Sequence, residues 1–246
     1  MRELKKLGHI TPSCNTVLEP VTAMINAPLT TRVSHHFARI PVENISLTPG
    51  DTDQFEVPTM VAAARSLCDA QMDAVVWNGT SGCWNGTEAD VAICTAITDA
   101  TGVPASTATL AQYDAFTTFG FARFGLAVPY AEDVTARTIQ TYRQAGYSAV
   151  SHANLGLTVG RDMAYVPLDE IRRLVRAANS PEAECVVVVC TGLPAALIVE
   201  EMEAELGKPI FDSVAVTLWR GLQLAGAPAR IEGWGRLLRG SPRTCD

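Results

Sequence analysis

The sequence predicts an α/β protein made of two similar halves, each a parallel sheet flanked by helices. Short strands that are apolar on both faces alternate with longer segments of helical periodicity, as in sheets buried between helices. The order of these elements and of the turns that follow them starts again near residue 124. This restart favours an internal duplication.

In the first half, strands are predicted at Leu7–Ile10 and Asp73–Trp77. A helix is predicted at 57–70, where apolar side chains recur at helical spacing. A second helix is predicted at 87–101, because Gly102 follows it as a C-terminal cap.

The second half has the same alternation of strands and helices. Its predicted elements are strands at 125–128 and 185–189 and helices at 131–145, 168–178 and 194–206.

Three landmarks recur in the same order in both halves. The paired segments are 7–13 with 124–130, 73–81 with 184–192, and 102–106 with 207–211. In the second pair, Gly79 corresponds to Cys190. Because ligands bind beyond the carboxyl ends of parallel strands, two facing halves place these turns around one cleft.

The repeat also suggests where the chain divides. We assign residues 1–117 to the first half, joined by the C-terminal segment 220–246, and residues 118–219 to the second half.

Composition narrows the class of protein. The 246 residues are 48% hydrophobic and 18% charged, with a net charge of -7 and a pI of about 5.1. A chain of this length buries a sizeable core, and its acidic balance argues against a nucleic-acid partner. No apolar run is long enough for a membrane span, and residues 1–6 lack the apolar stretch of a signal peptide. We therefore expect a cytoplasmic protein without a membrane partner.

Cysteine and histidine spacing predicts neither disulfides nor a metal site. Cysteines stand at positions 14, 68, 83, 94, 185, 190 and 245, without a CxxC pair, and the four histidines lack zinc-site spacing. We expect reduced thiols and no metal.

Five segments carry a resemblance to a known family. They are Ile10–Thr16, Gly79–Ser81, Val128–Val134, Leu155–Thr158 and Cys190–Leu193. In this order they resemble the aspartate/glutamate racemase superfamily, in its branch of arylmalonate decarboxylases and maleate cis-trans isomerases. The resemblance spans nearly the whole chain. It implies two pseudo-symmetric flavodoxin-like (Rossmann-like) halves, an active site in the cleft between them, and catalysis without a cofactor.

Departures from the family pattern divide the evidence between its two branches. The racemases and the maleate isomerases carry one cysteine in each half, whereas Gly79 stands at the first-half position here. Glycine in the first half and cysteine in the second is the pattern of arylmalonate decarboxylases, and Met163 also fits that branch. Asn15 fits the isomerases instead.

Cys190 is the candidate catalytic group. It ends an apolar strand and precedes Thr191-Gly192, where we expect nearby amides to favour a thiolate. The alternative is a buried structural cysteine, since free cysteine also packs as a small hydrophobe.

Hydrogen-bond donors accompany this cysteine at the predicted cleft. We expect the substrate to be held by Asn15, Gly79, Thr80, Ser81, Tyr130, Thr191 and Gly192. Hydroxyls and backbone amides bind a carboxylate and stabilise the enediolate that forms when a neighbouring carbon loses CO2 or a proton. Plain helix capping and turn formation are the alternative roles for such residues.

Other residues complete the predicted pocket. The candidates are Pro12, Ser13, Cys14, Val159 and Met163, while Trp77 and Trp84 belong either to the pocket or to the core. Cys14 and Cys83 are the two candidates for a displaced second cysteine.

These residues predict a cofactor-independent decarboxylase of a substituted malonate-type acid, in which Cys190 alone protonates the enediolate. The alternatives are a maleate-type or racemase-like isomerase and a non-catalytic carboxylate-binding protein. The partner is a small mono- or dicarboxylate, and assembly into a homo-oligomer stays open. If protonation is one-sided, Gly79→Cys should permit racemisation, provided that the larger side chain fits.

Overall fold

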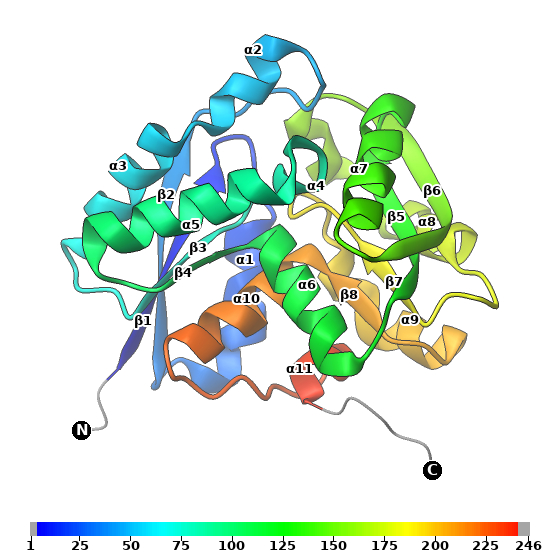
Figure 1. Ribbon diagram of the computed structural model, residues 1–246. Helices are drawn as coiled ribbons and strands as arrows, with labels where there is room; N and C mark the ends of the chain where they lie inside the picture. The colour runs from blue at the N-terminus through cyan, green and yellow to red at the C-terminus, as the bar shows by residue number, and fades with distance from the viewer. Residues whose placement is uncertain (1–3, 241–246) are drawn as a thin grey trace.

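The computed structural model describes residues 4–240 and contains two four-stranded parallel sheets side by side (Figure 1). The first sheet has the order β2-β1-β3-β4, with β1 (Lys5–Pro12), β2 (Val33–Ile40), β3 (Ala74–Trp77) and β4 (Ala105–Thr107). The second has the order β6-β5-β7-β8, with β5 (Arg123–Tyr130), β6 (Ser148–Leu157), β7 (Cys185–Val188) and β8 (Ile210–Asp212). The equal strand order confirms the predicted fold class of two pseudo-symmetric halves.

The strand register supports the correspondence between Gly79 and Cys190. Leu7 pairs with Ala74 in the first sheet, and Phe124 pairs with Cys185 in the second. Gly79 and Cys190 each lie five residues beyond these paired positions. The two turns therefore occupy equivalent places at the carboxyl ends of β3 and β7.

Helices cover both sheets. Those before β5 are α1 (Leu18–Asn26), η1 (Ala27–Leu29), α2 (Pro49–Thr52), η2 (Asp53–Phe55), α3 (Val57–Cys68), α4 (Gly82–Asn85), α5 (Thr87–Thr101) and α6 (Ala108–Phe119). Those after β5 are α7 (Glu132–Gln144), η3 (Gly160–Tyr165), α8 (Leu168–Ala178), η4 (Ala195–Ile198), α9 (Val199–Leu206), α10 (Ser213–Leu224) and α11 (Gly235–Arg239).

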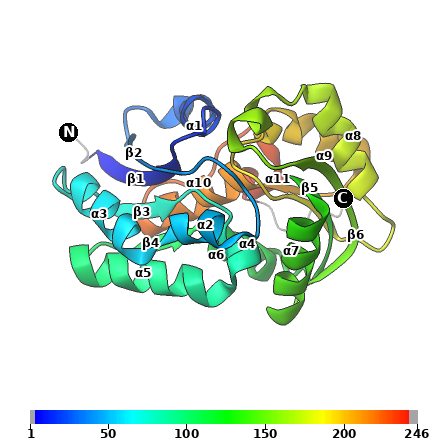
Figure 2. The same cartoon turned by 90° about the horizontal axis from the view of Figure 1, so that it is seen from above.

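Two helices each pack against the sheet of the other half, and together they form the centre of the molecule (Figures 1 and 2). Helix α10 follows the second sheet but packs against β3 and β4 of the first. Helix α6 follows the first sheet, yet its Phe116 and Phe119 pack against Phe124 and Phe211 of the second, at ring-centroid distances of 5.0 and 5.1 Å. This exchange buries a continuous apolar core between the sheets and holds the two halves in a fixed relation. The division at residues 117/118 and 219/220 stays a prediction.

The predicted strands and helices are all present, and apart from the helix expected at 194–206 their ends differ from the predicted ones by at most two residues. One region differs in kind: the helix expected at 194–206 begins as the 3-10 turn η4 and becomes α-helical only at Val199. The sequence did not predict strands β2, β4, β6 and β8 or helices α1, α2, α4, α6, α10 and α11.

Several expectations concern residues outside the described range. Cys245, residues 1–3 and the last six residues of segment 220–246 lie there. Within residues 4–240, no helix has the length and apolar character needed to span a membrane.

One stability prediction concerns Glu184, the residue immediately before β7. The Glu184 carboxylate accepts hydrogen bonds from the backbone N–H groups of Ala122 and Arg123, both at 2.8 Å. Although partial burial raises the pKa of Glu184, these N–H groups bring it below its usual value. A lowered folded-state pKa stabilises the fold above the unfolded pKa, and this stabilisation is lost as the pH falls.

We therefore expect Glu184→Gln to reduce the free energy of unfolding at pH 7 by about 1 kcal/mol, and the difference from wild type to shrink below about pH 4.5. Urea unfolding measures both effects. The neighbouring exposed Glu182 gives the matched control Glu182→Gln, and equal effects of the two variants would contradict this prediction.

Candidate active site

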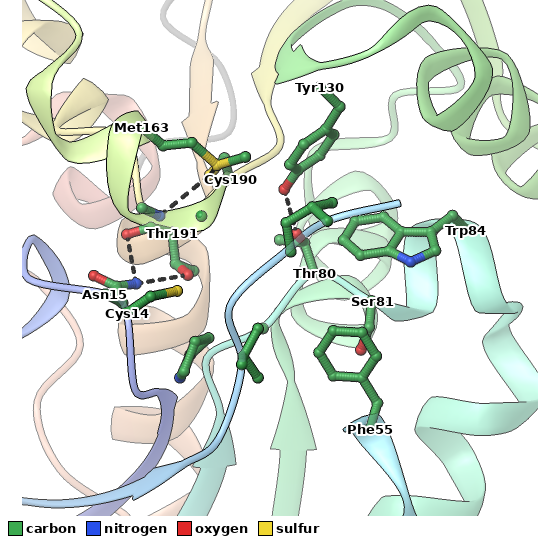
Figure 3. A pocket seen from close by; sticks show the side chains of 16 residues that line it. Cys14, Asn15, Phe55, Thr80, Ser81, Trp84, Tyr130, Met163, Cys190 and Thr191 are labelled. Carbon is green, nitrogen blue, oxygen red and sulfur yellow. Dashed lines mark hydrogen bonds between the residues drawn. The ribbon is translucent and has the colours of Figure 1, made fainter. Parts of the chain in front are cut away.

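A pocket lies where the carboxyl ends of β1, β3, β5 and β7 converge (Figure 3). The space enclosed by its lining is about 420 Å³, counting the open mouth. The predicted residues that line it are Pro12, Cys14, Asn15, Gly79, Thr80, Ser81, Tyr130, Met163, Cys190, Thr191 and Gly192. Ser13 and Val159 line an adjacent outer groove instead.

Cys190 lies at the inner end of this pocket and is only 3% exposed. Its backbone N–H donates to Ser213 Oγ at 3.1 Å, and the Gly192 N–H donates to its Sγ at 3.3 Å. Met163 Sδ is 3.4 Å from the same sulfur. The second-half turn and η3 thus hold the thiol in one position.

Burial raises the pKa of the Cys190 thiol to about 11, whereas the Tyr130 hydroxyl and the amides of Gly192 and Leu193 lower it. The amides therefore act in the direction expected from the sequence. Burial is the larger effect, so the expected thiolate is replaced by a protonated thiol at neutral pH.

Tyr130 connects the two halves across the pocket. Its hydroxyl lies 2.7 Å from Thr80 Oγ1 (Figure 3), and it lowers the pKa of the Cys190 thiol. Burial raises the pKa of Tyr130 well above its usual value. Tyr130 therefore remains a phenol that can donate a hydrogen bond to a developing oxyanion.

Asn15 and Thr191 form a second connection between the halves. Asn15 Nδ2 donates to both the backbone oxygen and Oγ1 of Thr191 at 3.1 Å, and Thr191 Oγ1 donates to the backbone oxygen of Asn78 at 2.6 Å. Asn15 Oδ1 accepts from the N–H groups of Val17 and Leu18 at the start of α1. Both side chains line the pocket, and contact of either with substrate stays a prediction.

Trp77 belongs to the core rather than to the pocket, since it is 0% exposed and absent from the lining. Its indole lies against Gly79, so that a Cβ atom at position 79 would be 2.0 Å from Trp77 Cζ2. A cysteine therefore does not fit at position 79 unless Trp77 moves. This corrects the expectation that Gly79→Cys alone adds a second thiol to the site.

The two other candidate cysteines differ in position. Cys14 is half-buried at the pocket mouth, and burial raises its pKa. Cys83 is buried outside the pocket against Thr109 and Tyr142, and burial raises its pKa to about 12. Cys83 is therefore not placed to act as a second cysteine in this pocket.

A segment between β2 and α3 covers the pocket, and sequence reasoning missed it. It contributes Val42, Ile45 and Phe55 to the lining. Its backbone bonds to the second half, with Ile45 N–H donating to the Thr158 oxygen at 2.8 Å and Gly160 N–H to the Glu43 oxygen at 2.9 Å. No local pattern marks these residues, because their role depends on where the segment crosses the cleft.

The pocket combines an apolar wall with neutral donors. Val42, Ile45, Phe55, Trp84 and Met163 form the wall, and Trp84 stacks edge-on against Tyr130 at 5.1 Å. Among residues 4–240, no arginine, lysine or histidine lines the pocket, and no cluster of three or more potential metal ligands occurs. An anion bound here is held by hydroxyls and backbone N–H groups.

The sequence of the chain is similar to those of arylmalonate decarboxylases and maleate isomerases. A family model described as "Arylmalonate decarboxylase" matches residues 43–238. The chain is 30% identical to arylmalonate decarboxylase of Bordetella bronchiseptica over 196 residues, which covers 78% of this chain and 81% of that protein. It is 24% identical to maleate isomerase of Pseudomonas putida over 251 residues, covering 98% and 100% of the two chains.

Solved structures agree on the fold. A maleate cis-trans isomerase mutant of Nocardia farcinica, with a covalently bound succinylcysteine intermediate, superposes with a TM-score of 0.89 at 16% identity, covering 97% of this chain and 100% of that one. A liganded mutant of arylmalonate decarboxylase superposes with a TM-score of 0.85 at 24% identity, covering 96% and 100%.

The geometry predicts that Tyr130 tunes the Cys190 thiol. Tyr130→Phe removes a hydroxyl that lowers the Cys190 pKa, so it should raise that pKa further. Because the thiolate is the reactive form, alkylation of Cys190 by iodoacetamide at pH 9 should slow. Peptide mass spectrometry measures the rate. Tyr142→Phe, which changes a buried tyrosine beside Cys83, is the matched control, and an unchanged rate in Tyr130→Phe would refute the assignment.

Proposed function

Because the chain belongs to the arylmalonate decarboxylase family, we propose that it decarboxylates α-substituted malonic acids without a cofactor. Membership confirms the superfamily resemblance inferred from the five motifs. The chain is an enzyme of this superfamily, since its relatives are decarboxylases and cis-trans isomerases. Of the two reactions, decarboxylation and cis-trans isomerisation, the residues of the site favour decarboxylation.

The retained carboxylate binds to the neutral donors of the pocket. Thr80, Ser81 and Tyr130 supply hydroxyls to the pocket, whereas the backbone N–H of Gly192 donates to the Cys190 sulfur. These groups are buried and fixed before the substrate arrives. They therefore stabilise the charge that develops on the carboxylate oxygens as the enediolate forms.

The departing carboxylate faces the apolar wall formed by Val42, Ile45, Phe55, Trp84 and Met163. An ionised carboxylate is poorly solvated there, whereas neutral CO2 is not penalised. When the C–C bond breaks, its electron pair stays on the α-carbon and delocalises into the retained carboxylate. CO2 leaves, and an enediolate remains.

Cys190 completes the reaction. Its Sγ–H bond breaks as the proton moves to the α-carbon, which gives a monocarboxylic acid and a thiolate that solvent reprotonates. A protonated thiol is the form that this step requires. The single observation that carries the proposal is one buried cysteine in the pocket, Cys190, with Gly79 at the equivalent first-half position.

The direct test is incubation with phenylmalonate, followed by NMR detection of phenylacetate and CO2. Formation of both supports decarboxylation. If neither forms while maleate is converted to its trans isomer, the decarboxylase assignment is wrong.

Isomerisation of maleate or a related cis-diacid is the second candidate. Maleate isomerases are relatives that match nearly the whole chain, and Asn15 lies at the pocket, as in the isomerase pattern. In this reaction the Cys190 thiolate would add to the double bond, the single bond would rotate, and elimination would release the trans acid. The raised pKa of Cys190 and the glycine at position 79 weigh against it.

We predict that Cys190→Ala lowers kcat for phenylmalonate by about 10²–10⁴-fold, which is the usual contribution of a positioned general acid. The fold should survive, as checked by circular dichroism and thermal unfolding. Cys68→Ala, at a half-buried cysteine on α3, is the matched control. A folded Cys190→Ala protein with the wild-type rate would exclude Cys190 as the proton donor.

The pH dependence separates the two reactions. Burial raises the pKa of Cys190 to about 11, so the thiol stays protonated and kcat for decarboxylation should be flat from about pH 6 to pH 9. A reaction that requires the thiolate would instead accelerate by about tenfold per pH unit over this range. Initial rates in buffers of constant ionic strength make the measurement, and a steep rise would contradict the acid role.

A further inference from the structure

The first-half turn requires glycine for lack of space, not for its backbone conformation. Gly79 does not adopt a positive φ. A Cβ atom there would lie 2.0, 2.3 and 2.8 Å from the Cζ2, Cε2 and Cη2 atoms of Trp77. Carbon atoms in contact are about 3.5–4.0 Å apart. The glycine and the tryptophan are therefore one structural unit.

The indole of Trp77 is held firmly in this position. It is fully buried in the core between the first sheet and helices α3 and α5, together with Ile10, Met60 and Ile93. Phe55, which lines the pocket, packs against it at a ring-centroid distance of 6.1 Å. The ring cannot move without disturbing this core.

The polar edge of the same indole reaches the pocket through Ser81. Trp77 Nε1–H donates to Ser81 Oγ at 3.3 Å, and Ser81 lines the pocket. A serine hydroxyl has one proton to donate and lone pairs that accept. Because the oxygen accepts from Trp77, the hydroxyl proton of Ser81 remains available to another acceptor.

We propose that Trp77 is a positioning residue of this site: its N–H orients Ser81 to donate to the substrate carboxylate, and its ring occupies the space that a first-half side chain would need. The inference rests on the proposed function and deepens it. Protonation is one-sided not only because a second thiol is missing. The core itself also excludes a side chain at position 79, which is the first-half equivalent of Cys190.

The orientation of Ser81 is tested by a double-mutant cycle with phenylmalonate. Trp77→Phe removes the N–H and keeps an aromatic ring, so kcat should fall by about two- to tenfold, with a smaller change in KM. In the Ser81→Ala background, Trp77→Phe should have no further effect on kcat, because the indole acts through the hydroxyl. Trp219→Phe, at a buried tryptophan of α10 outside the pocket, is the matched control.

A merely structural role for Trp77 would lower Tm without this coupling. If Trp77→Phe reduced kcat by the same factor with and without the Ser81→Ala change, the orientation of Ser81 by Trp77 would be overturned.

The steric part is tested by thermal unfolding without any substrate. Gly79→Ala should lower Tm by roughly 3–10 °C, whereas Gly50→Ala, at a glycine with no atom near its Cβ position, should not. In a Trp77→Leu background, the loss from Gly79→Ala should largely disappear. If Trp77→Leu does not fold, Trp77→Phe replaces it. Additive shifts in Tm would refute the pairing of Gly79 with Trp77.

The proposed function and the inference about Trp77 can be contradicted independently of each other. If the unmodified protein does not decarboxylate phenylmalonate, the proposed function is wrong, yet the Tm cycle still decides the steric pairing. Calorimetric binding of phenylacetate then serves as the readout for the Trp77–Ser81 cycle. Coupling there supports the positioning role, and additivity overturns it.

Discussion

The hydrogen bonds between the turns of the two halves are the interaction on which the site depends. Thr191 Oγ1 donates to the Asn78 backbone oxygen at 2.6 Å, and the hydroxyls of Thr80 and Tyr130 lie 2.7 Å apart. These short contacts close the space between the carboxyl end of β3 and those of β5 and β7. Cys190 is consequently buried, and burial determines that its thiol stays protonated.

The same closure supports the proposed binding of an anionic substrate by an acidic protein. With a net charge of -7 and no cationic side chain in the described part of the pocket lining, the site relies on hydroxyls and N–H groups. In a buried site such dipoles interact with an anion more strongly than they do in water. They also stabilise charge without neutralising it, which suits an enediolate that must still accept a proton at carbon.

Much of the site was predictable because the duplication is visible in the sequence. Once segment 73–81 is placed over 184–192, the parallel-sheet rule brings Gly79, Thr80 and Ser81 opposite Cys190. Edge strands β2 and β6 were missed because they are mostly half-exposed and lack a continuous apolar pattern. Val42, Ile45 and Phe55 were missed because their place in the lining depends on tertiary path. The burial that raises the pKa of Cys190 could not be predicted either, since the sequence reveals nearby amides but not the depth of burial.

The central claim is that one protonated thiol delivers the proton from one face of the enediolate. Its most direct test is decarboxylation of methyl(phenyl)malonate in D2O, with chiral chromatography and NMR of the 2-phenylpropionate formed. The account predicts a single enantiomer that carries one deuterium at the α-carbon and undergoes no further exchange on prolonged incubation. A racemic product, or exchange at the α-carbon of added 2-phenylpropionate, would contradict it.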